Sequence, residues 1–334
     1  MFQIEMPYIL FLGDSPYVKT ARGVKDWRPE QCIAQFRFPT NTIDLGLPDM
    51  DFDAAYAAGA RTVLLGGAPP GGGLPGHWVD SLVGALKAGF DIASGLHDKL
   101  NSHPVLGPLA AELQRKLWDI RSVDRSFTIG QFERRSGRRL LTVGTDCVVG
   151  KKYTALALHK EFVSRGVDAD FRATGQTGIL ISGAGIPIDS VVADFISSAA
   201  AELSPAAHDE HWDLIEGQGS LFHPAYAGVT MGLIHGSQPD AMVLCANPAL
   251  DRIGAFEAYP QPELAECLTR YVEAARLTNP DARIVGMSFN TSSFDEPDAA
   301  RLLEETSAKF NLPCVDPIRN GVGSIADEVL RAVM

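Results

Sequence analysis

Short apolar runs separated by helical patterns organise the first half of the chain. Tyr8–Gly13 (YILFLG), Thr62–Leu65 (TVLL) and Asp91–Ser94 are predicted buried strands, and residues 77–87 carry a helical pattern. Strands that alternate with helices indicate a wound, parallel sheet. We therefore expect an α/β fold that begins with a Rossmann-like domain at residues 1–106.

The first half lacks the loop by which such domains hold a dinucleotide. It contains no GxGxxG, and the run APPGGGLPG at residues 68–76 is too rich in proline to open a helix. We expect Rossmann-like topology without a nicotinamide site.

A leucine stripe and a basic stretch follow. Leu109, Leu113, Leu117 and Ile120 recur at helical spacing, which predicts an amphipathic helix over residues 107–121. We assign residues 107–137 to a connecting helix and linker. Residues 115–139 carry eight Lys or Arg against three acids. This segment is either a solvated connector or a source of arginines beside a polyanionic ligand.

The second half predicts a P-loop NTPase-like domain with a mostly parallel sheet at residues 138–334, whose loops act at the carboxyl ends of the strands. Helices are expected at residues 151–165 and 187–203. Strands are expected at residues 140–143, 168–173, 213–215, 241–245, 283–289 and 313–315.

Composition limits the partners. The 334 residues are 46% hydrophobic and 21% charged, enough for a sizeable core, and the length favours two domains. The net charge of −12 argues against non-specific attraction to nucleic acid or anionic membranes. An anionic small ligand would need a local basic pocket.

Cysteine usage and the N-terminus favour the cytoplasm. The five cysteines are scattered without a CxxC pair, which matches neither a disulfide framework nor a zinc site. MFQIEM has no basic region, and no apolar run approaches the roughly 18 residues of a membrane span. We expect no export and no membrane insertion. Exposed sheet edges favour a homo-oligomer.

The stretch LLTVGTDCVVGKKYT at residues 140–154 reads as a strand, a glycine-bounded turn and a helix start. Five residues separate its glycines, whereas the common Walker A loop has four, so it matches the GTDxxxGK variant of dethiobiotin synthetase. Glycines let backbone N–H groups converge on an oxyanion, and the helix N-terminus and a lysine add positive charge. The alternative is a tight turn without a ligand. The predicted phosphate-binding residues are Gly144, Thr145, Gly150, Lys151, Lys152 and Thr154.

The usual Ser or Thr after the loop lysine is missing. Lys152 occupies that position and cannot ligate magnesium. Two adjacent lysines suit an anion-rich ligand better than a Mg-nucleotide, so we expect no required metal. Cys147 is interpreted as a small loop residue, although a helix N-terminus can activate a thiol.

Three residues are candidates for proton transfer. Glu216 ends a predicted strand in WDLIEGQGSLFHP, where P-loop proteins often place an acid, and it is the leading general-base candidate. His97 in SGLHDKL and His223 are the others, because histidine titrates nearest neutrality. A structural carboxylate and hydrogen-bonded structural histidines are the alternatives. Without GxSxG, HExxH or a cysteine in a recognised nucleophile context, hydrolysis by covalent catalysis has little support.

Other polar loops follow predicted strands. RATGQTG offers Arg172 and Gln176 to a polar ligand, or is an ordinary glycine-rich turn. SFNTS places Asn290 where related folds approach a purine, and DPIRNG offers Arg319 to a carboxylate or phosphate.

Several motifs together resemble a known family. GAPPGGGLPGHW, SGLHDKL, GTDCVVGKK, RATGQTGILISGAGIPIDSVVADF, WDLIEGQGSLFHP and SFNTS are similar to the uncharacterised-domain P-loop family that includes the D-glutamate N-acetyltransferase DgcN. The resemblance covers nearly the whole chain. It implies a Rossmann-like domain, a P-loop domain, and acetyl transfer from the co-substrate acetyl-CoA to D-glutamate.

That resemblance implies roles for the candidate residues. The glycine loop and its lysines would bind the CoA phosphates, and Asn290 would approach the adenine. Arg172 or Arg319 would clamp the glutamate carboxylates. Glu216, ahead of His97, would deprotonate the substrate ammonium, and N–H groups near Gly217 or Gly219 would stabilise the oxyanion.

Two other functions fit the residues. An ATP-dependent, carboxylate-activating enzyme of the dethiobiotin synthetase type is favoured by the GTD loop. A non-catalytic nucleotide-binding protein is favoured by the missing magnesium ligand. Nothing in the residues distinguishes D- from L-glutamate.

Overall fold

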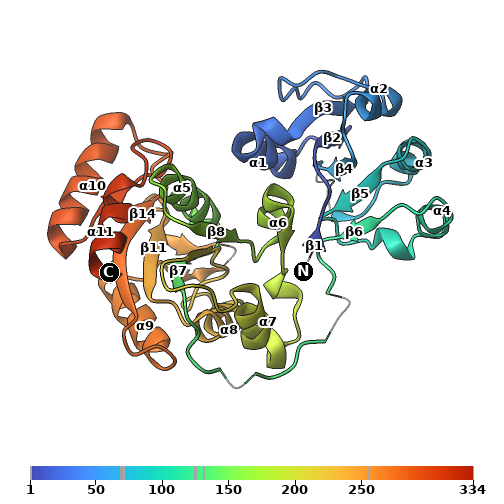
Figure 1. Cartoon of the computed structure of the whole chain (residues 1–334). Helices are drawn as coiled ribbons and strands as arrows, with labels where there is room; N and C mark the ends of the chain where they lie inside the picture. The colour runs from blue at the N-terminus through green and yellow to red at the C-terminus, as the bar shows by residue number, and fades with distance from the viewer. Residues whose placement is uncertain are drawn as a thin grey trace. The chain divides into compact units, whose positions relative to one another are not determined.

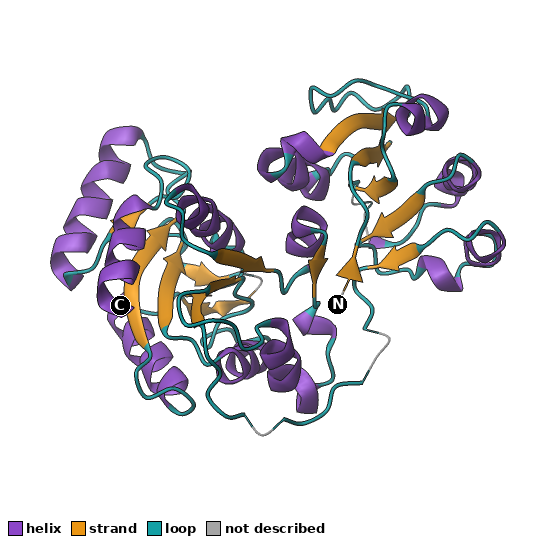
Figure 2. Cartoon of the chain, viewed as in Figure 1, coloured by secondary structure: helices purple, strands orange, loops and turns teal. Residues whose placement is uncertain are grey.

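The computed structural model describes residues 2–67, 69, 72–123, 126–130, 132–254 and 256–333. The chain forms two compact units, coloured along the sequence in Figure 1. Residues 1–125 and Gly175–Ser190 make the first unit, and Ser126–Thr174 with residues 191–334 make the second. Residues 175–190 therefore leave the second unit, join the first, and return. Figure 2 shows strands flanked by helices in each unit.

The first unit is built on a five-stranded parallel sheet of order β3-β2-β4-β5-β6. The three strands predicted in this half are confirmed as β2, β4 and β5. The bounds are β2 Tyr8–Gly13, β3 Cys32–Arg37, β4 Thr62–Leu65, β5 Asp91–Ser94 and β6 Leu117–Asp119.

Helices cover this sheet, and an antiparallel pair of two-residue strands lies beside it. The helices are α1 Lys19–Trp27, α2 Phe52–Ala57, α3 Val79–Lys87, α4 Leu106–Glu112 and α6 Gln176–Ser182, and the pair is β1 Phe2–Gln3 with β9 Ala184–Gly185. The helix predicted over residues 77–87 is confirmed as α3, preceded by a 3₁₀ turn at Gly76–Trp78. Part of the glycine-proline run at residues 68–76 lies outside the described residues.

The predicted helix over residues 107–121 is wrong in its second half. α4 ends at Glu112, and Gln114 adopts a left-handed conformation with φ of +55°. Leu117 then begins β6, which extends the sheet beside β5. The N–H of Lys116 donates to the Asp91 carboxylate at 2.8 Å, which fixes this edge strand. The leucine stripe therefore spans two elements of the first unit.

A tryptophan fills the crevice where sheets of this order commonly hold a ligand. The strand order reverses between β2 and β4, and ligands usually bind at such switch points. The Trp78 ring lies against Gly13 and Gly67, and a Cβ added at either glycine would approach it to 2.6 or 3.0 Å. Its Nε1–H donates to Asp14 at 2.8 Å.

The second unit contains a six-stranded parallel sheet of order β15-β14-β11-β7-β10-β8. Each strand corresponds to a predicted one, which confirms the P-loop-type α/β architecture. The bounds are β7 Arg138–Gly144, β8 Ala169–Arg172, β10 Trp212–Ile215, β11 Ala241–Ala246, β14 Arg283–Phe289 and β15 Cys314–Val315.

Helices flank this sheet, and a hairpin of β12 and β13 extends from it. The bounds are α5 Lys151–Ser164, α7 Ile196–Leu203, α8 Ala227–Ser237, α9 Leu264–Arg276, α10 Glu296–Phe310, α11 Gly323–Val333, β12 Arg252–Ile253 and β13 Phe256–Pro260. Buried Phe162, Trp212, Leu214 and Ile325 belong to the core beneath α5 and α11.

The helix predicted over residues 187–203 is also partly wrong. Only Ile196–Leu203 is α-helical, after 3₁₀ turns at Ile188–Ser190 and Ala193–Phe195. The chain passes from the first unit back to the second between these turns. Val192 is extended there, with φ of −56° and ψ of 136°, so one continuous helix cannot form.

No helix in the described part of the chain is both long and apolar enough to cross a membrane.

Candidate functional site

The candidate site lies at the carboxyl end of β7, the central strand of the second sheet. β10 and β11 pair with β7 on its two sides, and the chain reaches them in opposite directions from it. Open α/β sheets bind ligands at this kind of switch point. The loop from Gly144 to Gly150 crosses this place before α5 begins.

The glycines shape this loop around the start of α5. A Cβ at Gly144 would lie 2.8 Å from Val149 and 3.2 Å from Lys151 Nζ, so only glycine fits. Gly150 has φ of +104° and is the N-cap of α5, without a side-chain capping bond. The first N–H groups of a helix have no partners inside it, so this helix start is available to an anion.

Lys151 is folded over the loop. Its ammonium is buried and donates to the carbonyl oxygen of Asp146 at 2.6 Å. Burial lowers the pKa of Lys151. An anion bound at the loop would stabilise the charged form. Lys152 is only half-buried, and its ammonium lies 5.4 Å from the centre of the Tyr153 ring.

The two predicted threonines form hydrogen bonds that connect the loop to neighbouring strands. Thr154 is fully buried, and its hydroxyl lies 3.1 Å from the Gly150 carbonyl and 2.7 Å from the Ser288 hydroxyl. Thr145 donates its N–H to Cys245 at 3.0 Å. The Thr154 side chain and the Thr145 backbone therefore fix the loop against the strands.

Asp146 lies inside the GTD motif, but no role for it was predicted from the sequence. Its buried Oδ2 accepts from the Gly254 N–H at 2.7 Å and the Gln261 amide at 2.8 Å. These bonds join the phosphate loop to the β12–β13 hairpin and the residue after it. The position of this aspartate in the GTD motif was the signal in the sequence that could have indicated its role.

Tyr271, from α9, was also missed. Its hydroxyl donates to the Gly144 carbonyl at 2.7 Å and accepts from the Leu221 N–H at 3.1 Å. It therefore connects the phosphate loop with the loop after β10. No local pattern around Tyr271 signals this, because its partners are remote in sequence.

Glu216 lies just beyond β10 and is buried. Its negative charge favours the charged form of Lys151. Its Oε2 accepts the N–H of Thr174 at 3.0 Å. The structure thus contains the bond expected of a structural carboxylate, and it also brings this carboxylate to the phosphate loop. Its position is therefore compatible with both predicted roles, the general base and the structural carboxylate.

Gly217 packs directly on the central strand. A Cβ added there would lie 1.6 Å from the carbonyl oxygen of Thr142, and its N–H donates to the Thr142 hydroxyl at 2.9 Å. This N–H is one of the two predicted oxyanion donors, and an oxyanion would have to displace the Thr142 hydroxyl to reach it.

His223 faces the phosphate loop. One of its ring nitrogens lies within 4.8 Å of both an Asp146 carboxylate oxygen and the Cys147 sulfur. Its Nδ1 accepts the N–H of Ala225 at 3.2 Å, so the neutral ring carries its proton on Nε2. Nε2 makes no hydrogen bond within the described part of the chain, so it is available to a ligand.

Cys147 has the properties of an unreactive loop residue. The side chain is half-buried, and desolvation raises the pKa of its thiol. A thiol with a raised pKa is a poor nucleophile at neutral pH.

His97 and Gln176 belong to the first unit. His97 is exposed, and its N–H donates to Gly72 at 2.8 Å. The Gln176 side chain accepts from Arg121 Nε at 3.1 Å. The other predicted site residues lie in the second unit.

Both predicted arginine clamps already have partners. Arg172 Nε lies 2.6 Å from Asp213, and its Nη2 lies 2.9 Å from Asp170. Arg319 Nη2 donates to the Phe294 carbonyl at 2.6 Å. A carboxylate ligand would have to compete with these acceptors.

Hydrogen bonds connect the loop after β14 with the loop after β15. Asn290 donates its N–H to Ala246 at 2.9 Å, and its side chain accepts the Ser292 N–H at 3.1 Å. The Asp316 carboxylate accepts from the Thr291 N–H at 2.9 Å. Asn290 therefore sits at the carboxyl end of β14, two strands from the phosphate loop in the sheet order.

Three arginines at the end of the basic stretch lie near the amino ends of the strands in the second sheet. Arg134 pairs with Asp240 at 3.0 Å, Arg135 donates to the Gly236 carbonyl at 2.9 Å, and Arg139 lies near the start of β7. Arg139 is buried and burial lowers the pKa of Arg135, so this part of the basic stretch is a packed structural element and not a solvated connector.

Comparisons with known proteins agree with this architecture. A family described as "Domain of unknown function (DUF1611_C) P-loop domain" matches residues 126–326. "Domain of unknown function (DUF1611_N) Rossmann-like domain" matches residues 40–123.

Curated relatives match nearly the whole chain. A protein from Tritonibacter scottomollicae named D-glutamate N-acetyltransferase is 46% identical over 327 residues, covering 97% of this chain and 98% of the relative. A protein of the same name from Pseudoalteromonas is 46% identical over 326 residues, with the same coverage. A crystal structure of a DUF1611 family protein from Anabaena variabilis aligns with a TM-score of 0.83 at 30% identity, covering 97% of this chain and 99% of that one.

Proposed function

Since the chain belongs to the DUF1611 family, we propose that it is an N-acetyltransferase that moves acetyl from acetyl-CoA to the amino group of D-glutamate. The observation that carries the proposal is the 46% identity, over 97% of the chain, with two proteins named D-glutamate N-acetyltransferase. The phosphate loop supplies the chemical argument for the donor.

Coenzyme A carries a pyrophosphate and a 3′-phosphate, which this loop is suited to hold. Gly150 leaves the start of α5 uncapped, Lys151 is buried beside it, and Lys152 stands where a nucleotide hydrolase has its magnesium-binding hydroxyl. A transferase only has to anchor these phosphates, so the loss of that hydroxyl removes nothing it needs. Asn290, at the end of β14, is assigned to the adenine.

The reaction forms one N–C bond and breaks one C–S bond. The amine of D-glutamate attacks the thioester carbonyl, the carbonyl oxygen gains negative charge, and the thiolate of CoA leaves. The substrate ammonium must first lose a proton, and the thiolate gains one. The protein therefore has to accept a proton and stabilise an oxyanion.

Glu216 and His223 are assigned these two tasks. The carboxylate of Glu216 is the acceptor for the ammonium proton. His223 presents Nε2–H, because its Nδ1 accepts the N–H of Ala225, and is the donor to the oxyanion. Burial of both side chains strengthens these interactions relative to water.

Of the two arginines predicted to clamp the substrate, Arg319 is assigned to a substrate carboxylate, in exchange for the Phe294 carbonyl that it contacts at present. We place the reaction in the cytoplasm, which the five free cysteines support.

The test is an acetyl-transfer assay on the purified chain. We expect release of CoA thiol and formation of N-acetyl-D-glutamate from acetyl-CoA, with L-glutamate as the matched control acceptor. EDTA should leave the rate unchanged. Product formation that requires Mg-ATP and releases ADP would instead support the carboxylate-activating enzyme. Tight CoA binding without turnover on either enantiomer would support the non-catalytic nucleotide-binding protein.

A further inference from the structure

A cluster of histidines and carboxylates lies at the amino ends of the strands of the second sheet, whereas the phosphate loop lies at their carboxyl ends. Asp168 precedes β8 and His211 precedes β10, and these parallel strands pair in register with Trp212 opposite Ala169. Asp168 and His211 are therefore neighbours at the amino ends of the strands. None of the proposed acetyl-transfer steps uses them.

A tight turn brings a second histidine to the same carboxylate. The N–H of His211 donates to the His208 carbonyl at 3.0 Å, which closes a turn over residues 208–211. Asp168 Oδ2 lies 2.7 Å from His208 Nε2 and 2.6 Å from His211 Nδ1. One ligand atom from each of the three residues lies within 4.8 Å of the others.

The inner histidine is held from behind by a buried carboxylate. His211 Nε2 lies 3.2 Å from Asp213 Oδ1, and Asp213 also accepts from the Ser204 hydroxyl at 2.5 Å and from Arg172 Nε at 2.6 Å. Metal-binding histidines commonly give their second nitrogen to such a carboxylate, which fixes the tautomer and the ring orientation.

We propose that Asp168, His208 and His211 form a Zn²⁺ site, with solvent in the fourth position. Two imidazole nitrogens and one carboxylate oxygen are a ligand set that zinc prefers, whereas magnesium and calcium prefer oxygen alone. The side chains of Asp168 and His208 are 61% and 62% exposed, so an ion reaches them without unfolding, while that of His211 is 9% exposed.

The charge balance at this edge favours this trio over its neighbours. Asp170, His211 and Asp213 also converge, but the Arg172 guanidinium already contacts both of those carboxylates and repels a second cation. Both ring nitrogens of His211 face carboxylates, with Nδ1 toward Asp168 and Nε2 toward Asp213. Zinc replaces the proton on Nδ1, so binding releases a proton and weakens at acid pH.

This zinc fastens the loop at residues 204–211 to the start of β8. Because the site lies at the amino ends of the strands, away from the phosphate loop, it is separate from acetyl transfer. The proposal therefore stands or fails independently of the proposed function.

The test uses the untagged, full-length protein after EDTA treatment and dialysis. Calorimetric titration with ZnCl₂ should give one ion per chain and a higher Tm, while MgCl₂ gives neither. His208→Ala should weaken zinc binding by more than the roughly 10- to 100-fold that loss of an outer-sphere partner costs. Asp168→Asn should act similarly, and both are exposed positions that the fold tolerates.

His77→Ala is the matched control, because His77 is an exposed histidine 2.8 Å from Asp14 Oδ2 with no second histidine beside it. Its zinc affinity should equal that of the wild type. Equal affinity in the wild type and His208→Ala would overturn the proposal, as would the absence of any binding. Binding abolished by Cys147→Ser but retained in His208→Ala would also overturn it, because that result places the ion at Asp146, Cys147 and His223.

Discussion

The ammonium of Lys151 donates a hydrogen bond to the carbonyl oxygen of Asp146, five residues earlier, at 2.6 Å. The loop lysine is thus anchored to its own loop, and burial lowers its pKa. A ligand phosphate can replace the carbonyl as the acceptor and add negative charge beside the ammonium. The charged lysine therefore destabilises the protein when the loop is empty and stabilises the complex when a phosphate is bound.

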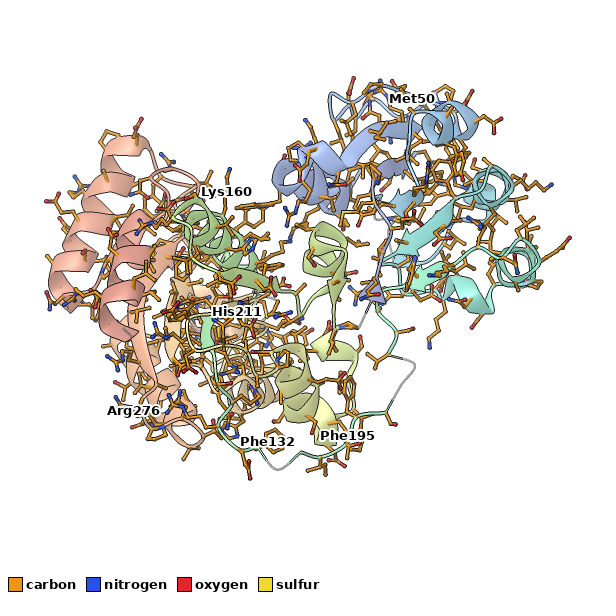
Figure 3. The ribbon with its side chains drawn as sticks, in the orientation of Figure 1. Met50, Phe132, Lys160, Phe195, His211 and Arg276 are labelled. Carbon is orange, nitrogen blue, oxygen red and sulfur yellow. The ribbon has the colours of Figure 1, made fainter. Side chains whose placement is uncertain are left out.

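Lys151→Met should separate these two effects. Because burial disfavours the charged ammonium, its removal should leave the free energy of unfolding unchanged or raise it. CoA affinity should fall about 10- to 100-fold, since a hydrogen bond to a charged group contributes about 1.5–3 kcal/mol. Urea unfolding and calorimetric titration with CoA measure the two quantities. Lys160→Met, at an exposed position of the same helix labelled in Figure 3, should change neither.

Glu216→Gln and His223→Gln should both lower kcat, but they should respond differently to pH. Loss of a general base or of an oxyanion donor each costs about 100-fold or more. At alkaline pH the substrate amine is already unprotonated, so Glu216→Gln should recover activity while His223→Gln should not. The measurement is kcat against pH for both variants. Turnover of Glu216→Gln at the wild-type rate would remove this carboxylate from the base role.

Gly217→Ala should unfold or strongly destabilise the second unit. The added Cβ would lie 1.6 Å from the Thr142 carbonyl oxygen, and the central strand cannot move away without disturbing the sheet. We expect a loss of about 3 kcal/mol or more in urea denaturation. Gly228→Ala is the control, because nothing lies within 4 Å of its added Cβ on α8. It should stabilise by about 0.5–1 kcal/mol, and equal effects of the two substitutions would contradict the packing.

Stability should fall at alkaline pH because of His211. Hydrogen bonds with Asp168 and Asp213 outweigh burial and raise the pKa of His211 in the folded protein. This contribution is complete below the unfolded pKa of about 6.5 and is lost as the pH rises through the raised value. Asp168 acts in the opposite direction, since the His211 hydrogen bond lowers the pKa of its carboxyl group and stability is lost as the pH falls through that value.

Urea unfolding in EDTA, over about pH 5 to pH 9, measures this profile. His211→Gln should flatten the alkaline limb, whereas His77→Ala should retain it. An alkaline limb of the same size in His211→Gln would assign the effect to another group.

Local patterns were sufficient to predict the strands of both sheets that carry continuous apolar runs, and the loop between Gly144 and Gly150. They failed where distant partners decide the structure. The spacing of Leu113 and Leu117 fits a helix, but Leu117 pairs with β5, and this pairing brings Asp119 and Lys116 into contact with remote residues. No local propensity contains that information.

The candidate site shows the same limit. Lys151 and Glu216 could be found because a motif and a strand end mark them. Tyr271 comes from a helix more than a hundred residues beyond the loop that it supports, as its bond to Gly144 shows. Arg172 was found as a charge at a strand end, but its pairing with Asp213 depends on the order of β8 and β10 in the sheet.

The most direct test of the account compares acetyl-CoA with acetyl-pantetheine, which carries the same thioester without the phosphates. We would measure kcat/KM for both donors with D-glutamate, in the wild type and in Lys151→Met. The account predicts a strong preference of the wild type for acetyl-CoA, and loss of about 10- to 100-fold of that preference in Lys151→Met. The same preference in both proteins, or none in the wild type, would contradict the claim that the loop at the start of α5 holds the phosphates of coenzyme A.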